Sequence, residues 1–103
     1  MKEKRTFYIR QRFPYKEQVD YIYEYFSITG RNGSQRFIFH KQLREPGYAI
    51  SDSHTGTCIM KGLHKMSKLN FKKICEFILC TTDVRKNQER FPRVSKLKNY
   101  EGE

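Results

Sequence analysis

The segment from residue 67 to residue 82, SKLNFKKICEFILCTT, constrains the fold more than any other part of the chain. Its apolar residues recur at the spacing that places side chains on one face of an α-helix, namely Phe71, Ile74, Cys75, Ile78 and Leu79. The segment therefore predicts an amphipathic helix, with Ser67 as its N-cap. Such a helix buries its apolar face against another element, so the rest of the chain has to provide a matching surface.

That surface is predicted to be an antiparallel sheet. Residues 6–13 alternate between apolar and polar side chains, and residues 35–41, 48–52 and 57–61 are short strand-like runs separated by turn residues. We therefore expect an α+β fold. In this fold a small antiparallel sheet of about four to five strands carries one helix, from the C-terminal half of the chain, on one face.

Residues 15–29 fit either a strand or a second helix. A strand over 21–28 alternates, and its inward-facing side chains are Ile22, Phe26 and Ile28. A helix over the same segment carries an apolar stripe on one side and acidic residues on the other. The close succession of Tyr, Ile and Phe favours the strand. If both flanks are strands, the Asn32-Gly33 pair that follows is typical of a two-residue type I′ hairpin turn.

The chain is long enough for one domain and too short for two, because it has 103 residues. We expect a single α+β domain over residues 1–82. Residues 83–103 lose periodicity and are rich in Lys and Arg, and Pro92 interrupts any helix there. They are therefore interpreted as a basic C-terminal tail or arm.

The charge balance predicts an anionic partner. Lys and Arg together number 21 against 11 Asp and Glu, which gives a formal net charge of +10. Nucleic acid is the first expectation, and an acidic protein or nucleoprotein is the second. The aromatic content of 15% argues against a disordered chain, since disordered segments combine high charge with few aromatic residues.

A sheet with one helix on one face should leave its other face open. The strand interpretation places on that face a row of aromatic and basic side chains: Tyr8, Arg10, Arg12, Tyr21, Tyr23, Tyr25, Arg36 and His40. Lys41 and Arg44 follow in the adjoining loop, and Arg85, Lys86, Arg90 and Arg93 lie in the basic tail. Aromatic rings interleaved with cations are typical of surfaces that bind single-stranded nucleic acid more readily than duplex. The same face would alternatively serve a small adaptor or inhibitor that binds an acidic protein or nucleoprotein.

Residues 47–62, GYAISDSHTGTCIMKG, place Asp52, Ser53 and His54 side by side. A Ser-His-Asp triad is assembled from separate parts of a fold, and sequence neighbours project in different directions. Asp, Ser, Thr and Gly are turn residues, so the stretch predicts a hairpin turn with His54 as a loop-tip contact at most. We therefore expect a non-enzymatic protein.

The three cysteines, Cys58, Cys75 and Cys80, and the three histidines lack the paired spacing of zinc ligands, so no metal or cofactor is predicted. An odd cysteine count in a chain without an apolar leader favours a reducing compartment. No apolar run reaches the roughly 20 residues of a membrane helix. These features favour a cytoplasmic protein without a membrane partner.

Overall fold

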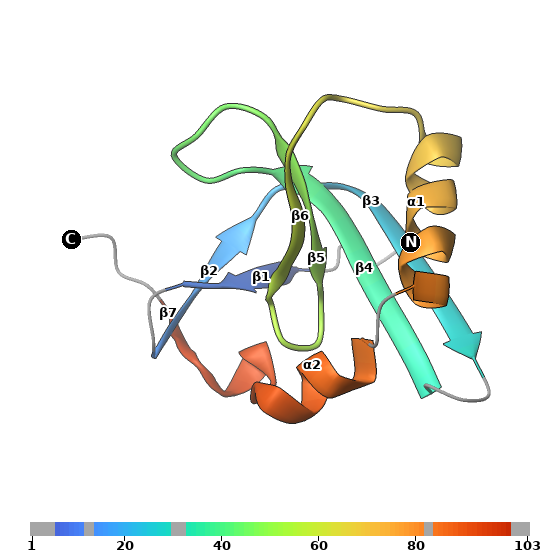
Figure 1. Ribbon diagram of the computed structural model, residues 1–103. Coiled ribbons are helices and arrows are strands. Elements are labelled where there is room, and N and C mark those ends of the chain that lie inside the picture. The colour runs from blue at the N-terminus through green and yellow to red at the C-terminus, as the bar shows by residue number, and fades with distance from the viewer. Residues whose placement is uncertain (1–5, 12–13, 30–32, 82–83, 100–103) are drawn as a thin grey trace, which may run out of the picture.

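The computed structural model describes residues 6–11, 14–29, 33–81 and 84–99. The described strands form two sheets, with helix α1 beside one of them and helix α2 below the hairpin of β5 and β6 (Figure 1). In chain order the elements are β1 (Phe7–Arg10), β2 (Tyr15–Val19), β3 (Tyr21–Thr29), β4 (Gly33–Lys41), β5 (Tyr48–Asp52), β6 (Cys58–Leu63), α1 (Lys68–Thr81), α2 (Val84–Arg90), the 3-10 helix η1 (Val94–Lys96) and β7 (Lys98–Asn99).

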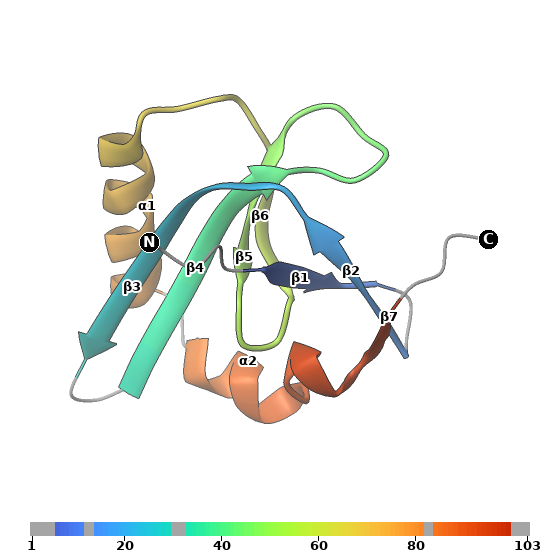
Figure 2. The ribbon, with the colours of Figure 1, turned by 180° about the vertical axis from the view of Figure 1, so that it is seen from behind.

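The larger sheet has the order β3-β4-β5-β6 and is antiparallel throughout. The smaller sheet has the order β1-β2-β7, in which β1 and β2 are antiparallel and β7 lies parallel to β2. Only Asp20 separates β2 from β3, so the chain passes directly from one sheet into the other (Figure 2). The predicted α+β class is confirmed, and residues 15–29 form strands, so the helical alternative is wrong.

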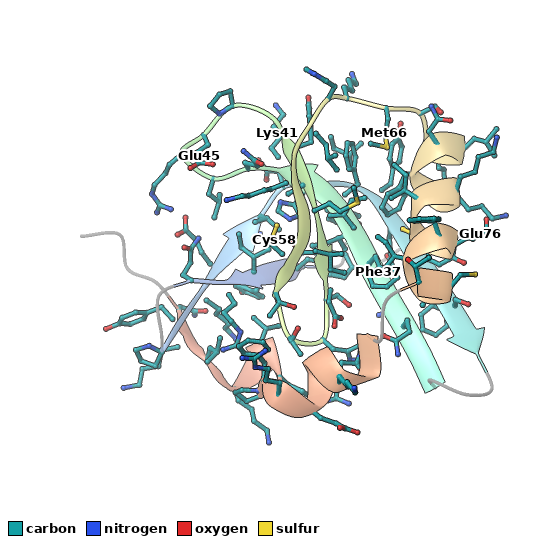
Figure 3. All side chains as sticks on the ribbon, in the orientation of Figure 1. Phe37, Lys41, Glu45, Cys58, Met66 and Glu76 are labelled. Atoms are coloured by element: carbon teal, nitrogen blue, oxygen red, sulfur yellow. The ribbon has the colours of Figure 1, made fainter. Side chains whose placement is uncertain are left out.

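Helix α1 occupies nearly the predicted range, and its N-cap is confirmed because the Ser67 hydroxyl accepts a hydrogen bond from the Asn70 N–H at 3.2 Å. Its buried face packs on the larger sheet, and Figure 3 shows Phe37 between that sheet and α1. The buried residues of this core are Phe37, Phe39, Ile50, Phe71, Cys75 and Ile78. The periodic stripe seen in the sequence is therefore the stripe that meets the sheet.

The other face of the larger sheet is covered by the smaller sheet, so the expectation of an open face is wrong over most of that face. Phe7 of β1 and Val19 of β2 are buried against Ile38 of β4, and Ile9, Tyr21 and Leu43 pack around them. The sequence had suggested that β1 pairs within a single sheet. Instead β1 and β2 form a second layer, because burying Ile38 and Phe7 together removes apolar surface that a one-sided sheet leaves in water.

Tyr23 and Tyr25 face the core rather than solvent, which corrects their predicted position. Tyr23 lies directly opposite Phe39, and Tyr25 lies directly opposite Phe37, with the rings stacked at centroid distances of 5.8 and 6.4 Å. The cause is the loop length. Thr29 pairs with Gly33, so Gly33 belongs to the strand and three residues, rather than two, lie between the paired ends. An odd rather than an even number of loop residues shifts the register by an odd number of positions, and such a shift turns every side chain to the opposite face.

Phe26 lies on the outer face for the same reason and is 47% exposed, although the alternation over 21–28 had predicted it to face the core. A register irregularity between Tyr21 and Tyr23 then reverses the alternation once more. Tyr21 consequently points to the smaller sheet, where its ring meets Phe7 edge-on at 4.7 Å. The tyrosine row expected along β3 is thus divided between two cores.

Residues 84–99 are folded against the domain instead of extending as an arm. They form α2, η1 and β7, and Val94 and Leu97 are buried. The Lys98 N–H donates to the Pro14 carbonyl at 2.9 Å, which extends the parallel pairing of β7 with β2. Neither α1 nor α2 has the length and apolar character that a helix crossing a membrane requires.

The β5–β6 turn is largely buried and is hydrogen-bonded to two other segments, so it is not a free loop tip. The Arg10 N–H donates to the Gly56 carbonyl at 2.8 Å, and the Val94 N–H donates to the His54 carbonyl at 2.8 Å. In both views the end of this hairpin lies next to α2 (Figures 1 and 2). The turn therefore joins β1 and the C-terminal segment, which are far apart in the sequence.

Gly56 of this turn is expected to be sensitive to substitution. Its φ is +72°, and a Cβ there would lie 2.6 Å from the Arg10 nitrogen and 2.8 Å from Val94 Cγ2. Gly56→Ala should lower the free energy of unfolding by about 2–4 kcal/mol, since a left-handed residue costs about 1–2 kcal/mol and overpacking about 1–3 kcal/mol. Chemical denaturation measures this change.

Gly62→Ala is the matched control, because Gly62 has a φ of +68° but a Cβ at this position would have no neighbouring atom within 4 Å. Only the conformational cost of about 1–2 kcal/mol should remain there. Equal decreases in stability for the two variants would contradict the close packing of Gly56.

Candidate functional site

A basic cleft opens where the two sheets, the β5–β6 turn and η1 meet. Its volume is about 360 Å³. We call it the basic cleft, and its lining residues are Thr6, Phe7, Tyr8, Lys16, Arg36, Ser53, His54, Arg93, Val94 and Ser95. Three cations, one histidine and several hydroxyl groups thus face one opening, and no carboxylate residue is among these described lining residues. Such a set of groups is suited to holding an anion.

Lys16 and Tyr8 form one wall of the cleft. In the β1–β2 ladder Tyr8 lies opposite Gln18, so Lys16 is its diagonal neighbour on the same face. The Lys16 ammonium lies 4.6 Å from the centre of the Tyr8 ring and donates to the Ser95 carbonyl at 3.3 Å. These contacts hold the ammonium group at the cleft and bring η1 close to β2.

Arg36 forms a second wall from β4. Its partner in the ladder is Phe26, and the guanidinium carbon lies 4.8 Å from the Phe26 ring centre. Arg36 Nε lies 2.9 Å from a Glu24 carboxylate oxygen, which neutralises part of its charge. Arg36 belongs to the predicted outer face, and the smaller sheet leaves its partner Phe26 47% exposed there, although Phe26 was predicted to face the core.

Arg93 supplies the third cation from the C-terminal segment. The neighbouring Val94 is buried, and the Val94 N–H donates to the His54 carbonyl. The burial of Val94 therefore fixes the position of Arg93 at the cleft. Within the described part of the chain, neither Arg93 nor Lys16 forms an ion pair with a carboxylate. These two residues therefore carry most of the unneutralised charge of the cleft.

The carboxyl group of Asp52 stabilises the turn whose residues line the cleft. It is fully buried, and it accepts hydrogen bonds from the His54 N–H at 2.9 Å, from the Thr55 hydroxyl at 3.4 Å and from the Gln88 side chain. Removal from water raises the pKa of Asp52, and these hydrogen bonds oppose part of that rise. Asp52 therefore shapes the turn that presents Ser53 and His54, and its hydrogen bonds among the described residues go to the His54 N–H, Thr55 and Gln88 rather than to the His54 ring.

Arg10 is half-buried and clamps other segments of the fold, so it is not the fully exposed cation that its alternation with Ile9 predicted. Its Nε donates to the Thr55 carbonyl at 3.1 Å, a terminal nitrogen donates to the Pro92 carbonyl at 2.6 Å, and its guanidinium lies 5.0 Å from the Phe91 ring centre. Burial lowers the pKa of Arg10, although a guanidinium remains protonated in any protein. Two of its three side-chain nitrogens are thus engaged within the fold.

His40 is also internal, against its predicted place on a wet face. It is 2% exposed, and Nδ1 lies 2.9 Å from the Lys41 carbonyl while Nε2 lies 2.8 Å from the Ser51 hydroxyl. A carbonyl oxygen can only accept, so Nδ1 carries the proton and donates. Burial lowers the pKa of His40, which favours the neutral ring, and Nε2 then accepts from Ser51.

The remaining predicted residues lie in several places. Lys41 is exposed near the β4–β5 loop, away from α2 (Figure 3), and Arg44 of that loop donates to both Glu17 carboxylate oxygens at 2.8 and 3.0 Å. Arg85 and Lys86 are part of α2, and Arg90 ends it with its guanidinium 5.9 Å from the Phe91 ring centre. Arg12 lies outside the described residues.

The structure thus brings together Tyr8, Arg36 and Arg93 from the predicted set. It adds Lys16, which the sequence analysis missed because residues 15–19 were not read as a strand of their own. The alternation of Tyr15, Glu17 and Val19 would have placed Lys16 beside Tyr8 in a hairpin with β1. In the described part of the chain, no group of three or more His, Cys, Asp and Glu residues is arranged to hold a metal ion.

Comparison of the chain with protein-family models, with curated proteins and with solved structures gave no match.

The clamp role of Arg10 predicts a decrease in stability on its removal. Arg10→Ala should lower the free energy of unfolding by about 2 kcal/mol, because hydrogen bonds from a charged donor contribute about 1.5–3 kcal/mol. Thermal and denaturant unfolding measure the change. Lys41→Ala, at an exposed position, should change stability by less than about 0.5 kcal/mol. Equal stability of the two variants would contradict the clamp.

Asp52 predicts a specific pH dependence of stability. Its folded pKa is raised, so the folded state binds the proton more tightly than the unfolded state. The Asp52 contribution should therefore become more favourable as the pH falls from neutral through the folded pKa towards the ordinary value of 3.8. The free energy of unfolding of the native chain, measured relative to Asp52→Asn, should rise over that range. A constant or falling difference would contradict this assignment.

Proposed function

We propose that the protein is a non-enzymatic binding module for single-stranded nucleic acid, with the basic cleft as its phosphate-binding centre. The observation that carries the proposal is the convergence of Lys16, Arg36 and Arg93 on one opening, with no carboxylate among the described residues that line it. Phosphate contacts of this kind supply most of the affinity for nucleic acids. The net charge of +10 adds a long-range attraction for a polyanion.

Two aromatic rings beside the cleft support a single-stranded ligand. Tyr8 and Phe26 each lie against a cation of the cleft, and Phe26 is 47% exposed. The Phe26 ring is 47% exposed although a cation lies against it, so part of this ring remains accessible for stacking with a base. Stacking on an aromatic side chain contributes about 1–3 kcal/mol per base and requires bases that are not already stacked in a duplex.

The proposed binding surface is smaller than the row of tyrosines and arginines predicted from the sequence, so it contacts fewer nucleotides. Tyr23 and Tyr25 pack against the core under α1, His40 is buried, and the half-buried Arg10 is engaged by the Thr55 and Pro92 carbonyls, so the proposed surface does not include them. The basic residues of η1 and β7, Lys96 and Lys98, are exposed and extend the positive surface from the cleft. These lysines would position the backbone of the strand without reading its sequence.

Binding of a labelled single strand of about 20 nucleotides tests the proposal by fluorescence anisotropy. The double variant Lys16→Ala, Arg93→Ala should bind about tenfold or more weakly at low salt. It should also reduce the slope of log affinity against log salt by about one to two, since each phosphate that the protein neutralises contributes close to one unit to that slope. A duplex of the same length should bind the native chain more weakly.

The double variant Lys68→Ala, Lys72→Ala is the matched control, because it removes the same formal charge from exposed positions on α1. Its affinity and salt slope should stay close to those of the native chain. If both double variants weaken binding equally, the affinity comes from diffuse charge and the cleft is not the centre. Failure of the native chain to bind at low salt would refute nucleic-acid binding altogether.

A further inference from the structure

A second surface, on the opposite side of the β5–β6 hairpin from the basic cleft, has a different character. An apolar groove of about 370 Å³ lies between β6 and α1, and we call it the β6–α1 groove. It is lined by Ile59, Met60, Lys73, Ile74, Phe77, Ile78 and Thr81. Met60 is 37% exposed and Phe77 is 66% exposed, so two large apolar side chains flank an apolar floor in contact with water.

Strand β6 forms an edge of the larger sheet. Only β5 pairs with it among the described strands, so one side of its backbone is not engaged in a ladder. Unpaired edges are places where an extended segment of another chain can add a strand. The Gly62 N–H is bonded to the Gln42 side chain at 2.6 Å, so that end of β6 is closed. At the Cys58–Lys61 end no described strand pairs on the outer side, and the Cys58 thiol donates to the Met60 carbonyl at 3.4 Å.

The charge of the segments that form the groove indicates which kind of partner it binds. Residues 58–81, which span β6 and α1, contain five lysines and one acidic residue, Glu76, a balance of 5 − 1 = +4. Two copies of this chain paired edge to edge would place these lysine-rich segments together, at a cost in like-charge repulsion. An acidic segment instead gains attraction, because Lys61 on the edge and Lys73 in the groove meet opposite charge.

We propose that the β6–α1 groove binds an extended acidic segment of another protein. The segment adds a strand at the edge of β6, with apolar side chains at alternate positions in the groove and carboxylates towards Lys61 and Lys73. Main-chain pairing supplies the orientation, and the apolar floor with the flanking lysines selects the side chains. This site is independent of the proposed nucleic-acid binding, since the two surfaces share no lining residue among those described.

Selection from a displayed library of random peptides about twelve residues long, against the full chain, provides the probe, because a six-residue strand spans about 20 Å. The enriched peptides should be acidic and should alternate apolar and polar residues. When the best of them is labelled and titrated, hydrogen exchange at the amides of 58–61 should slow. No enrichment, enrichment of basic or non-alternating peptides, or unchanged exchange in β6 would overturn the proposal.

Matched variants locate the site. Phe77→Ser should weaken binding of the selected peptide about tenfold or more, because a central aromatic anchor dominates interfaces of this kind. Leu69→Ser makes a comparable change on the same helix at a residue that is 61% exposed and does not line the groove, and it should change affinity less than about twofold. Both residues are exposed, so circular dichroism and unfolding should confirm an intact fold.

The charge requirement is tested in the same way. Lys73→Glu should weaken the acidic peptide more than Lys72→Glu, since Lys73 lines the groove and its exposed neighbour does not. Equal effects within either pair of variants would overturn the groove as the site. If sedimentation instead showed concentration-dependent dimers that Phe77→Ser abolishes, the occupant would be a second copy, and the proposal of an acidic partner would be wrong.

Discussion

The attachment of the β5–β6 turn to β1 and to the C-terminal segment is the interaction on which the rest of the structure depends. Two backbone hydrogen bonds, from Arg10 to Gly56 and from Val94 to His54, join three segments that are remote in the sequence. The Arg10 guanidinium reinforces the same junction through the carbonyls of Thr55 and Pro92. Each bond contributes only about 1 kcal/mol, but together they give the smaller sheet and η1 a fixed position against the larger sheet.

This junction also explains where the surfaces available for binding lie. The larger sheet is covered by α1 on one face and by β1 and β2 on the other, which leaves little of either face for a ligand. The candidate binding surfaces therefore lie at the seam between the sheets and along an edge. The basic cleft lies at the seam of the two sheets, and the β6–α1 groove lies along an edge. Basic residues thus line both the basic cleft, where hydroxyl groups accompany them, and the β6–α1 groove, which is apolar.

Strands β1, β4, β5 and β6 and helix α1 were predictable because alternation and helical spacing are local properties, as Phe37, Phe39, Phe71 and Cys75 illustrate. The orientation of β3 was not, because it depends on one residue of loop length and on an irregularity near Tyr21. The folding of residues 84–99 was also hidden. Val94 and Leu97 are isolated apolar residues without periodicity, and two paired residues are too few to give β7 a strand signal.

For the candidate site, the sequence alone determined the positive charge, the residue types and the turn at 52–57, because composition and turn chemistry are local. Only the tertiary structure decided which cations meet, bringing Lys16, Arg36 and Arg93 together while burying His40 and engaging Arg10 in hydrogen bonds within the fold. The physical reason is that a side chain's role follows from what covers its face of a sheet, and here that cover comes from a second layer formed by distant strands.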